Sequence, residues 1–90
     1  EVLETSTEAV LMDTRGWVYY RAGEYEKAKT FLLRAINSTK EVQPIYRLHL
    51  GKTHLGLDDK ASARQQLQLA LEADSDFDGS AEARKLLEEL

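Results

Sequence analysis

Two stretches of the chain carry the same pattern: GWVYYRAGEYEKAKTFLLRA at residues 16–35 and GKTHLGLDDKASARQQLQLA at residues 51–70. At an offset of 35 residues, small residues coincide with small ones and large apolar residues with large apolar ones. Self-similarity at a fixed period of this size is typical of stacked repeat architectures. The sequence therefore predicts two copies of one packing unit. The matched pairs are Gly16 with Gly51, Ala28 with Ala63, Leu32 with Leu67, Ala35 with Ala70, and Tyr19 with His54.

Each unit reads as two helices, because its apolar residues recur at spacings of three and four. The first helix is expected over residues 10–22 and ends at Gly23, which tolerates the left-handed conformation common at helix ends. Asp58 or Asp59 is expected to cap the second helix of the second unit. A fifth helix is predicted from near Ser80, and no segment alternates with period two as a strand would.

The small residues predict where helices approach closely. Gly16 and Gly51 have no Cβ, and the matched alanines carry only a methyl group. Helices that cross at such positions can come nearer than the usual interaxial distance of about 8–10 Å. The expected organisation is a linker or the tail of a preceding repeat at 1–8, one unit at 9–43, a second at 44–78 and a capping helix at 79–90.

Composition and charge exclude several classes of function. The chain has 90 residues, of which 42% are hydrophobic and 31% charged, as in ordinary globular domains. It has no cysteine, which excludes a disulfide scaffold, a thiolate zinc site and a cysteine nucleophile. The net charge is -4 and bases are interleaved with acids, so we expect neither nucleic acid nor an anionic membrane surface as a partner. No apolar run approaches the roughly 20 residues that span a bilayer, so direct membrane insertion is not expected either.

The repeated pattern resembles the tetratricopeptide repeat family. The resemblance implies an all-α fold, a right-handed superhelical stack of antiparallel helix pairs, with two units, a C-terminal capping helix and five helices in all. It is similar to the C-terminal segment of bacterial multi-repeat members, which implies a piece of a longer protein from the bacterial cytoplasm or periplasm. The residues that carry the resemblance are Met12-x2-Arg15-Gly16-x2-Tyr19 and Ala28-x3-Leu32 in unit one, and Arg47-x2-Leu50-Gly51-x2-His54 and Ala63-x3-Leu67 in unit two.

Four positions depart from the family pattern. Met12 stands in place of the common tryptophan, His54 in place of tyrosine, and Arg15 and Arg47 in place of large apolar residues. Arg15 is expected to reach toward a preceding repeat or to extend into solvent. The glycine and alanine framework is intact in both units, so the resemblance holds.

In this family the first helix of each pair lines a concave groove that binds a peptide or a helix. Aromatic and aliphatic side chains predominate at the lining positions, as they do in binding hot spots, and Trp17 is expected to be the main contact. The alternative is that this lining only packs against a neighbouring repeat or a second copy of the chain. The carboxylate clamp of the chaperone-tail binders is not expected, since only Lys52 fits it. The lining residues implied by the resemblance are Val10, Asp13, Trp17, Tyr20, Arg21, Ile45, Leu48, Lys52 and Leu55.

The sequence contains no sign of an enzyme. Its glycines are scattered singly, so no phosphate-binding loop is present, and no serine lies in a nucleophile-elbow context. His49 and His54 are five residues apart, which prevents both from binding one metal from a single straight helix. We therefore expect neither catalysis nor a cofactor.

One acidic turn resembles a calcium loop. Residues 74–79 read DSDFDG, which matches the first half of the EF-hand loop. The twelfth position, where a bidentate glutamate is needed, is Lys85. The favoured interpretation is an inter-helix turn in which Asp76 or Asp78 caps the last helix and Phe77 fills the core. In the calcium interpretation, the ligands would be Asp74, Asp76 and Asp78.

Three hypotheses of function follow. The first is a protein-interaction scaffold that binds a protein or peptide in its groove. The second is a structural C-terminal cap that ends a longer array of repeats and helps it to self-associate. A homo-oligomer would then form through the exposed N-terminal edge, around Val10 to Arg15. The third is a calcium-responsive module at residues 74–79.

Overall fold

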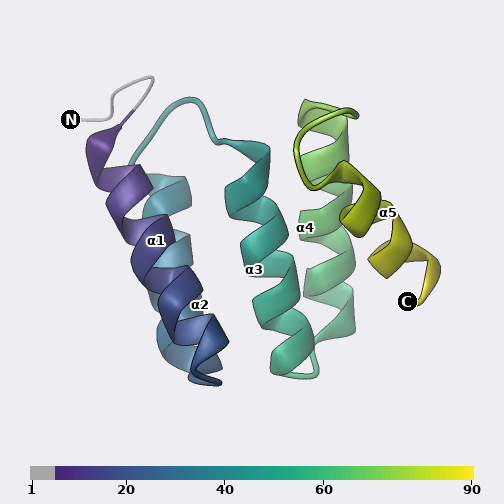
Figure 1. The fold of residues 1–90 in the computed structure, drawn as a ribbon, viewed down its shortest axis with the longest axis horizontal. Helices are drawn as coiled ribbons and strands as arrows, with labels where there is room; N and C mark the ends of the chain where they lie inside the picture. Colours follow the sequence, from purple (N-terminus) through teal and green to yellow (C-terminus); the bar gives the residue numbers. More distant parts are fainter. Residues whose placement is uncertain (1–5) are drawn as a thin grey trace.

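The computed structural model describes residues 6–90, which form five helices and no strand. Successive helices run antiparallel and pack side by side (Figure 1). The predicted all-α stack of helix pairs is confirmed. No helix within residues 6–90 combines the length and apolar character that a membrane crossing needs. The helices are α1 (Thr7–Arg21), α2 (Tyr25–Asn37), α3 (Pro44–Gly56), α4 (Lys60–Ala73) and α5 (Ser80–Glu88).

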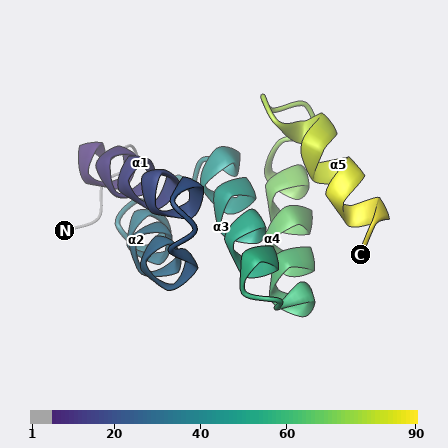
Figure 2. The same cartoon turned by 60° about the horizontal axis from the view of Figure 1, so that its bottom comes forward.

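The helices form a layered stack. α1 pairs with α2 and α3 with α4, while α2 packs on α3 and α5 packs on α4. When the molecule is turned, α1 and α5 lie toward the same side of the stack, and α3 lies between them (Figure 2). We call the side formed by α1, α3 and α5 the inner face. Its side chains come from the first helix of each predicted unit and from the last helix.

The first unit begins earlier than the sequence pattern indicated. The Ser6 side chain accepts a hydrogen bond from the Ala9 amide at 3.2 Å, so α1 starts at Thr7 rather than at residue 10. A serine in this position satisfies one of the free amides of the first turn. The helix ends as predicted, with Gly23 in the left-handed region at φ 80°.

The second unit repeats this turn with different residues. Asp58, which lies 35 residues after Gly23, also has a positive φ of 61°. Asp59 then caps α4, since its carboxylate accepts a hydrogen bond from the Ser62 amide at 3.1 Å. The prediction that one of the two aspartates caps this helix is therefore confirmed.

The predicted cap of the last helix is wrong. The residue before α5 is Gly79, and neither Asp76 nor Asp78 makes a side-chain cap. Gly79 has a φ of 120°, and a Cβ there would lie 2.8 Å from Leu48 Cδ2, so a capping side chain has no room at this position. The other half of the prediction is confirmed, because Phe77 is buried in the core.

Small residues allow the close packing that the repeat predicted. A Cβ on Gly16 would lie 2.6 Å from Leu32 Cγ, and one on Gly51 would lie 3.0 Å from Leu67 Cγ. The helices therefore approach more closely there than a side chain on either glycine would permit. The matched alanines and the two leucines are fully buried: Ala28, Leu32, Ala35, Ala63, Leu67 and Ala70.

Candidate interaction surface

Three rings stack across the boundary between the two units on the inner face. The Trp17 ring lies 4.9 Å from the Tyr20 ring at an interplanar angle of 9° and 4.2 Å from the His49 ring at 20°. Trp17 and Tyr20 are three residues apart on α1, a spacing that places them on one side of a helix, and His49 comes from α3. We call these three rings the aromatic stack.

A lysine from α3 connects the aromatic stack to α5. Lys52 Nζ lies 5.0 Å from the centre of the Trp17 ring and 5.7 Å from that of Tyr20. The same Nζ is 2.7 Å from Glu82 Oε2. A cation over an aromatic face contributes about 0.5–1 kcal/mol at exposed sites, and a partly exposed ion pair contributes at most about 1 kcal/mol. Lys52 thus joins α1, α3 and α5 through contacts that are each modest.

A buried pair fixes the other end of the aromatic stack. His49 Nδ1 donates a hydrogen bond to Asp13 Oδ1 at 2.8 Å, and the side chains of both residues are only 13% and 12% exposed. The bond holds the His49 ring in the plane that stacks on Trp17. Tyr46 lies close by: burial raises its pKa, and the negative charge of Asp13 raises the pKa further. Asp13 therefore serves the interface between α1 and α3.

The structure brings four of the predicted lining residues together and separates the others. Asp13, Trp17, Tyr20 and Lys52 form one connected group through His49. Leu48 belongs to the core instead: it is 2% exposed and packs with Leu67, Ala70, Phe77 and Ala83, because α5 folds back over this part of α3 and α4. Of the remaining predicted residues, Val10 and Arg21 are exposed, Leu55 is half-buried, and Ile45 is half-buried against two core clusters.

Sequence reasoning missed two members of this group, His49 and Glu82. The spacing of three between His49 and Lys52 puts both on one side of α3 and is a usable signal. The neighbouring Leu48, four residues before Lys52, satisfies helical spacing equally well. Whether Leu48 or His49 faces Trp17 depends on how α3 is rotated relative to α1. The periodicity within a single helix does not determine this rotation. No comparable signal marks Glu82.

Two surface hollows lie outside the inner face. One, of about 320 Å³, is formed where α1 and α2 meet and is lined by Thr14, Arg15, Val18, Tyr19 and Phe31. The other, of about 390 Å³, lies beside the turn before α5 and includes Asp74, Asp76 and Asp78. Asp74 Oδ1 accepts a hydrogen bond from the Asp76 amide at 2.9 Å, so this carboxylate is used within the turn. Within residues 6–90, no three His, Cys, Asp or Glu side chains are grouped so that they could hold a metal ion.

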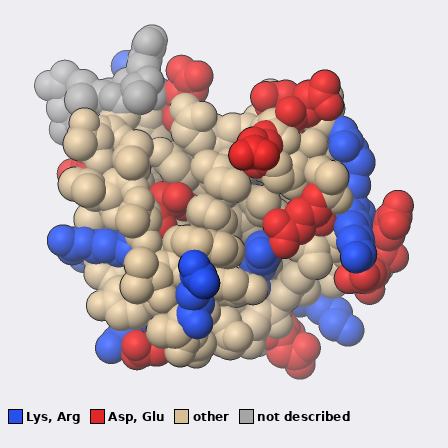
Figure 3. Space-filling model, viewed as in Figure 1, with Lys and Arg blue, Asp and Glu red and all other residues tan. Residues whose placement is uncertain are grey.

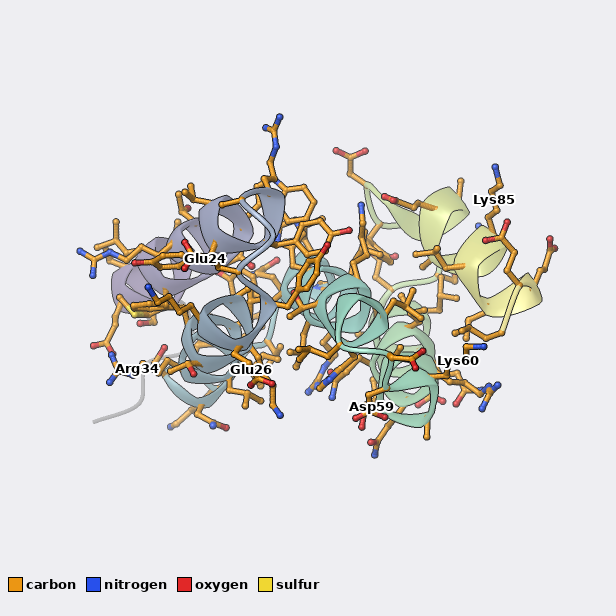
Figure 4. The ribbon with its side chains drawn as sticks, turned by 90° about the horizontal axis from the view of Figure 1, so that it is seen from below. Glu24, Glu26, Arg34, Asp59, Lys60 and Lys85 are labelled. Atoms are coloured by element: carbon orange, nitrogen blue, oxygen red, sulfur yellow. The ribbon has the colours of Figure 1, made fainter. Side chains whose placement is uncertain are left out.

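Charge is unevenly distributed over the molecule. On the face seen in Figure 3, acidic and basic side chains gather toward the α4 and α5 end, while uncharged residues predominate over α1 and α3. Side chains such as Arg34 on α2 and Lys85 on α5 point away from the stack (Figure 4).

Comparison with known proteins identifies the repeat. A family model described as tetratricopeptide repeat matches the chain twice, at residues 11–41 and at residues 46–77. No curated protein and no solved structure matched the chain. The two matches coincide with the helix pairs α1–α2 and α3–α4 and together cover most of the sequence. The chain belongs to the tetratricopeptide repeat family.

Proposed function

We propose that this chain is a protein-interaction scaffold whose inner face binds a peptide or a helix of a partner protein. Tetratricopeptide repeats generally mediate protein–protein interaction, and the family fold is non-catalytic. That the inner face is the binding surface is inferred from the aromatic stack, with Trp17 half-buried at its centre. Tryptophan, tyrosine and arginine are the residues that most often dominate binding energy at interfaces.

The aromatic stack supports binding because contacts within the chain hold its rings in place. The pair of Asp13 and His49 fixes one end, and Lys52 covers the Trp17 and Tyr20 rings at the other. Ordering an interface side chain costs about 0.5–1.5 kcal/mol, and a surface that is already ordered avoids that cost. Val10 and Arg21 are exposed on α1, seven residues before and four residues after Trp17, so helical spacing places all three on one side of the helix. A partner with an apolar side chain for the rings and an acid for Arg21 fits this surface.

The experiment must separate binding from folding. Trp17 stacks on residues of α1 and α3, so Trp17→Ala lowers stability as well as removing a contact. Arg21→Glu is the sharper test, because Arg21 is exposed, and Arg34→Glu is its matched control on the outer side of α2. Peptides are selected from a random phage library on the chain, and the affinity of a selected peptide is measured by isothermal titration for each variant.

We expect Arg21→Glu to weaken binding about ten-fold or more, and Arg34→Glu to change it less than about two-fold. Peptide binding should also change the fluorescence of Trp17, the single tryptophan of the chain. Equal effects of the two arginine variants, or selected peptides that leave Trp17 fluorescence unchanged, would contradict binding at the inner face.

A further inference from the structure

The hollow where α1 and α2 meet has the features of a small-molecule site. Its volume is about 320 Å³, and it lies outside the inner face. Pockets that hold small ligands begin at about 300 Å³ and combine apolar and aromatic walls with a few polar groups. We call it the α1–α2 hollow. The residues that line it are Thr14, Arg15, Val18, Tyr19 and Phe31.

Two aromatic rings form one wall of the α1–α2 hollow. The rings of Tyr19, from α1, and Phe31, from α2, are stacked with their centres 5.4 Å apart and an interplanar angle of 13°. Both side chains are half-buried, and Val18 beside them is 61% exposed. The hollow is therefore an apolar surface that is open to solvent and whose shape is fixed by a contact between two helices.

Positive charge surrounds the two rings. Arg15 lines the hollow, and Arg34 Cζ lies 5.8 Å from the centre of the Phe31 ring. Arg34 extends from α2 at the end of the molecule opposite α5 (Figure 4). Both arginines are exposed, and neither forms an ion pair with another residue of the range 6–90. A third cation near the rings, Lys27, already pairs with Glu24 at 3.2 Å. The two arginines therefore leave this surface ready to attract an anion, although the net charge of the chain is -4.

The framework of the repeat does not account for these residues. Arg15 and Phe31 correspond to Leu50 and Gln66, which lie 35 residues later. Neither the cation nor the stacked ring pair therefore recurs in the second unit. The helix pairs pack through the matched glycines, alanines and leucines, which both units share. The combination of an arginine with two stacked rings is particular to the first unit, and the packing of the repeat does not require it.

We propose that the α1–α2 hollow binds a small hydrophobic anion, a molecule with one or two rings and a carboxylate. The rings pack on Val18, Tyr19 and Phe31. The carboxylate pairs with the Arg15 guanidinium, whose fork of donors matches the two carboxylate oxygens. The volume of the hollow, at the lower end of the range for ligand pockets, restricts the ligand to this size. The hollow lies outside the inner face, so the proposal does not depend on the binding of a peptide there.

The probe is 1-naphthylacetate, which has two fused rings and one carboxylate, and 1-naphthylacetamide is its uncharged control. Each is titrated into the isotope-labelled chain and followed by NMR. We expect saturable shifts of the backbone amides of Val18, Tyr19 and Phe31, while the Trp17 indole N–H on the inner face stays unchanged. A Kd of about 1 mM is expected for a ligand of this size. The carboxylate should bind at least about three-fold more tightly than the amide.

A matched pair of variants tests the role of Arg15. Arg15→Gln and Arg64→Gln each remove one exposed positive charge, but Arg64 lies on α4, which does not line the hollow. We expect Arg15→Gln to abolish the preference for the carboxylate over the amide, and Arg64→Gln to leave it unchanged. Val18→Asp should weaken both ligands at least about three-fold, because it places a charge in the apolar wall. All three side chains are exposed, so the melting curves should match that of the unchanged chain.

Four outcomes would overturn the proposal. They are the lack of a saturable shift up to about 5 mM probe, shifts centred on the Trp17 indole, equal affinities for the carboxylate and the amide, and equal losses in Arg15→Gln and Arg64→Gln. The last outcome would mean that the carboxylate responds to net charge rather than to the hollow. None of them bears on peptide binding at the inner face, which the Arg21→Glu and Arg34→Glu variants test separately.

Discussion

Gly16 and Gly51 occupy equivalent positions in the two units, but the space around them differs. Both lie inside helices, where a glycine costs about 0.5–1 kcal/mol relative to alanine, and in each unit the lack of a Cβ admits a leucine from the paired helix. The contact is tighter in the first unit, where the missing Cβ would lie 2.6 Å from the leucine rather than 3.0 Å. The same substitution should therefore have different effects in the two units.

We expect Gly16→Ala to lower the free energy of unfolding by about 1–2 kcal/mol, and Gly51→Ala by less than about 1 kcal/mol. Overpacking of about 1–3 kcal/mol is partly offset by the helix propensity gained. Urea unfolding at constant pH measures both. Gly23→Ala is the control for backbone strain without a clash, since its Cβ would have no neighbour within 4 Å while φ is 80°. A larger loss for Gly51→Ala than for Gly16→Ala would show that the contact with leucine is not the cause.

His54 provides a second prediction at the scale of the residue. The side chain is buried, and its Nδ1 has no hydrogen-bond partner within residues 6–90. Burial lowers the pKa of His54 below 6.5, and this effect outweighs the Asp59 carboxylate, 3.9 Å away, which raises it. The unfolded chain therefore binds a proton at higher pH than the folded chain does, so stability is lost as the pH falls below about 6.5.

His54→Gln removes this titration. Between about pH 7.5 and pH 5.5, we expect the urea midpoint of the wild-type chain to fall by more than that of His54→Gln. An NMR titration of the His54 ring protons gives the folded pKa directly. A folded pKa at or above 6.5, or equal losses in the two proteins, would be incompatible with desolvation as the dominant effect.

At the scale of the elements, long-range side-chain contacts decide how the helices are held on the inner face. Trp17 from α1 stacks on His49 from α3, and Lys52 from α3 pairs with Glu82 from α5. Each contact is individually weak, but each joins helices that local sequence does not connect. α5 has only nine residues and depends on such contacts and on its apolar face to remain docked.

Glu82→Gln should loosen α5 without unfolding the stack. The loss in global stability is expected to be below about 1 kcal/mol, because the ion pair is partly exposed. Hydrogen exchange should show α5 amides exchanging several-fold faster while α2 amides are unchanged. Glu88→Gln, at an exposed position of the same helix, is the matched control and should leave exchange of α5 unaltered. Equal acceleration in both variants would assign the effect to net charge rather than to Lys52.

At the scale of the whole molecule, the stack is closed at one end and open at the other. α5 seals the core around Leu67 and Phe77, so that Ala83 is fully buried. Leu11 and Val18 at the other end remain exposed. The 37 × 28 × 19 Å molecule therefore presents chemically different surfaces at its two ends.

A matched pair of substitutions tests the closure by α5. Ala83→Glu places a carboxylate in the sealed core and should lower the free energy of unfolding by about 3 kcal/mol or more. Ala81→Glu, two residues earlier and exposed, should change it by less than about 0.5 kcal/mol. Thermal unfolding at one protein concentration distinguishes them. Similar melting temperatures for the two variants would mean that α5 does not seal the core in solution.

The sequence by itself determined the repeat, the five helices, the close approach of paired helices at Gly16 and Gly51, and the turn at Gly23. Each of these depends only on local residue spacing and residue size. The sequence did not predict that Gly79 precedes α5 without a side-chain cap. The clash of a Cβ at Gly79 with Leu48 involves residues that are distant in the chain. Only the tertiary structure decided that Leu48 enters the core while His49 joins the aromatic stack. Periodicity fixes which residues share one side of a helix, but the rotation of each helix about its axis is set by how all five pack together.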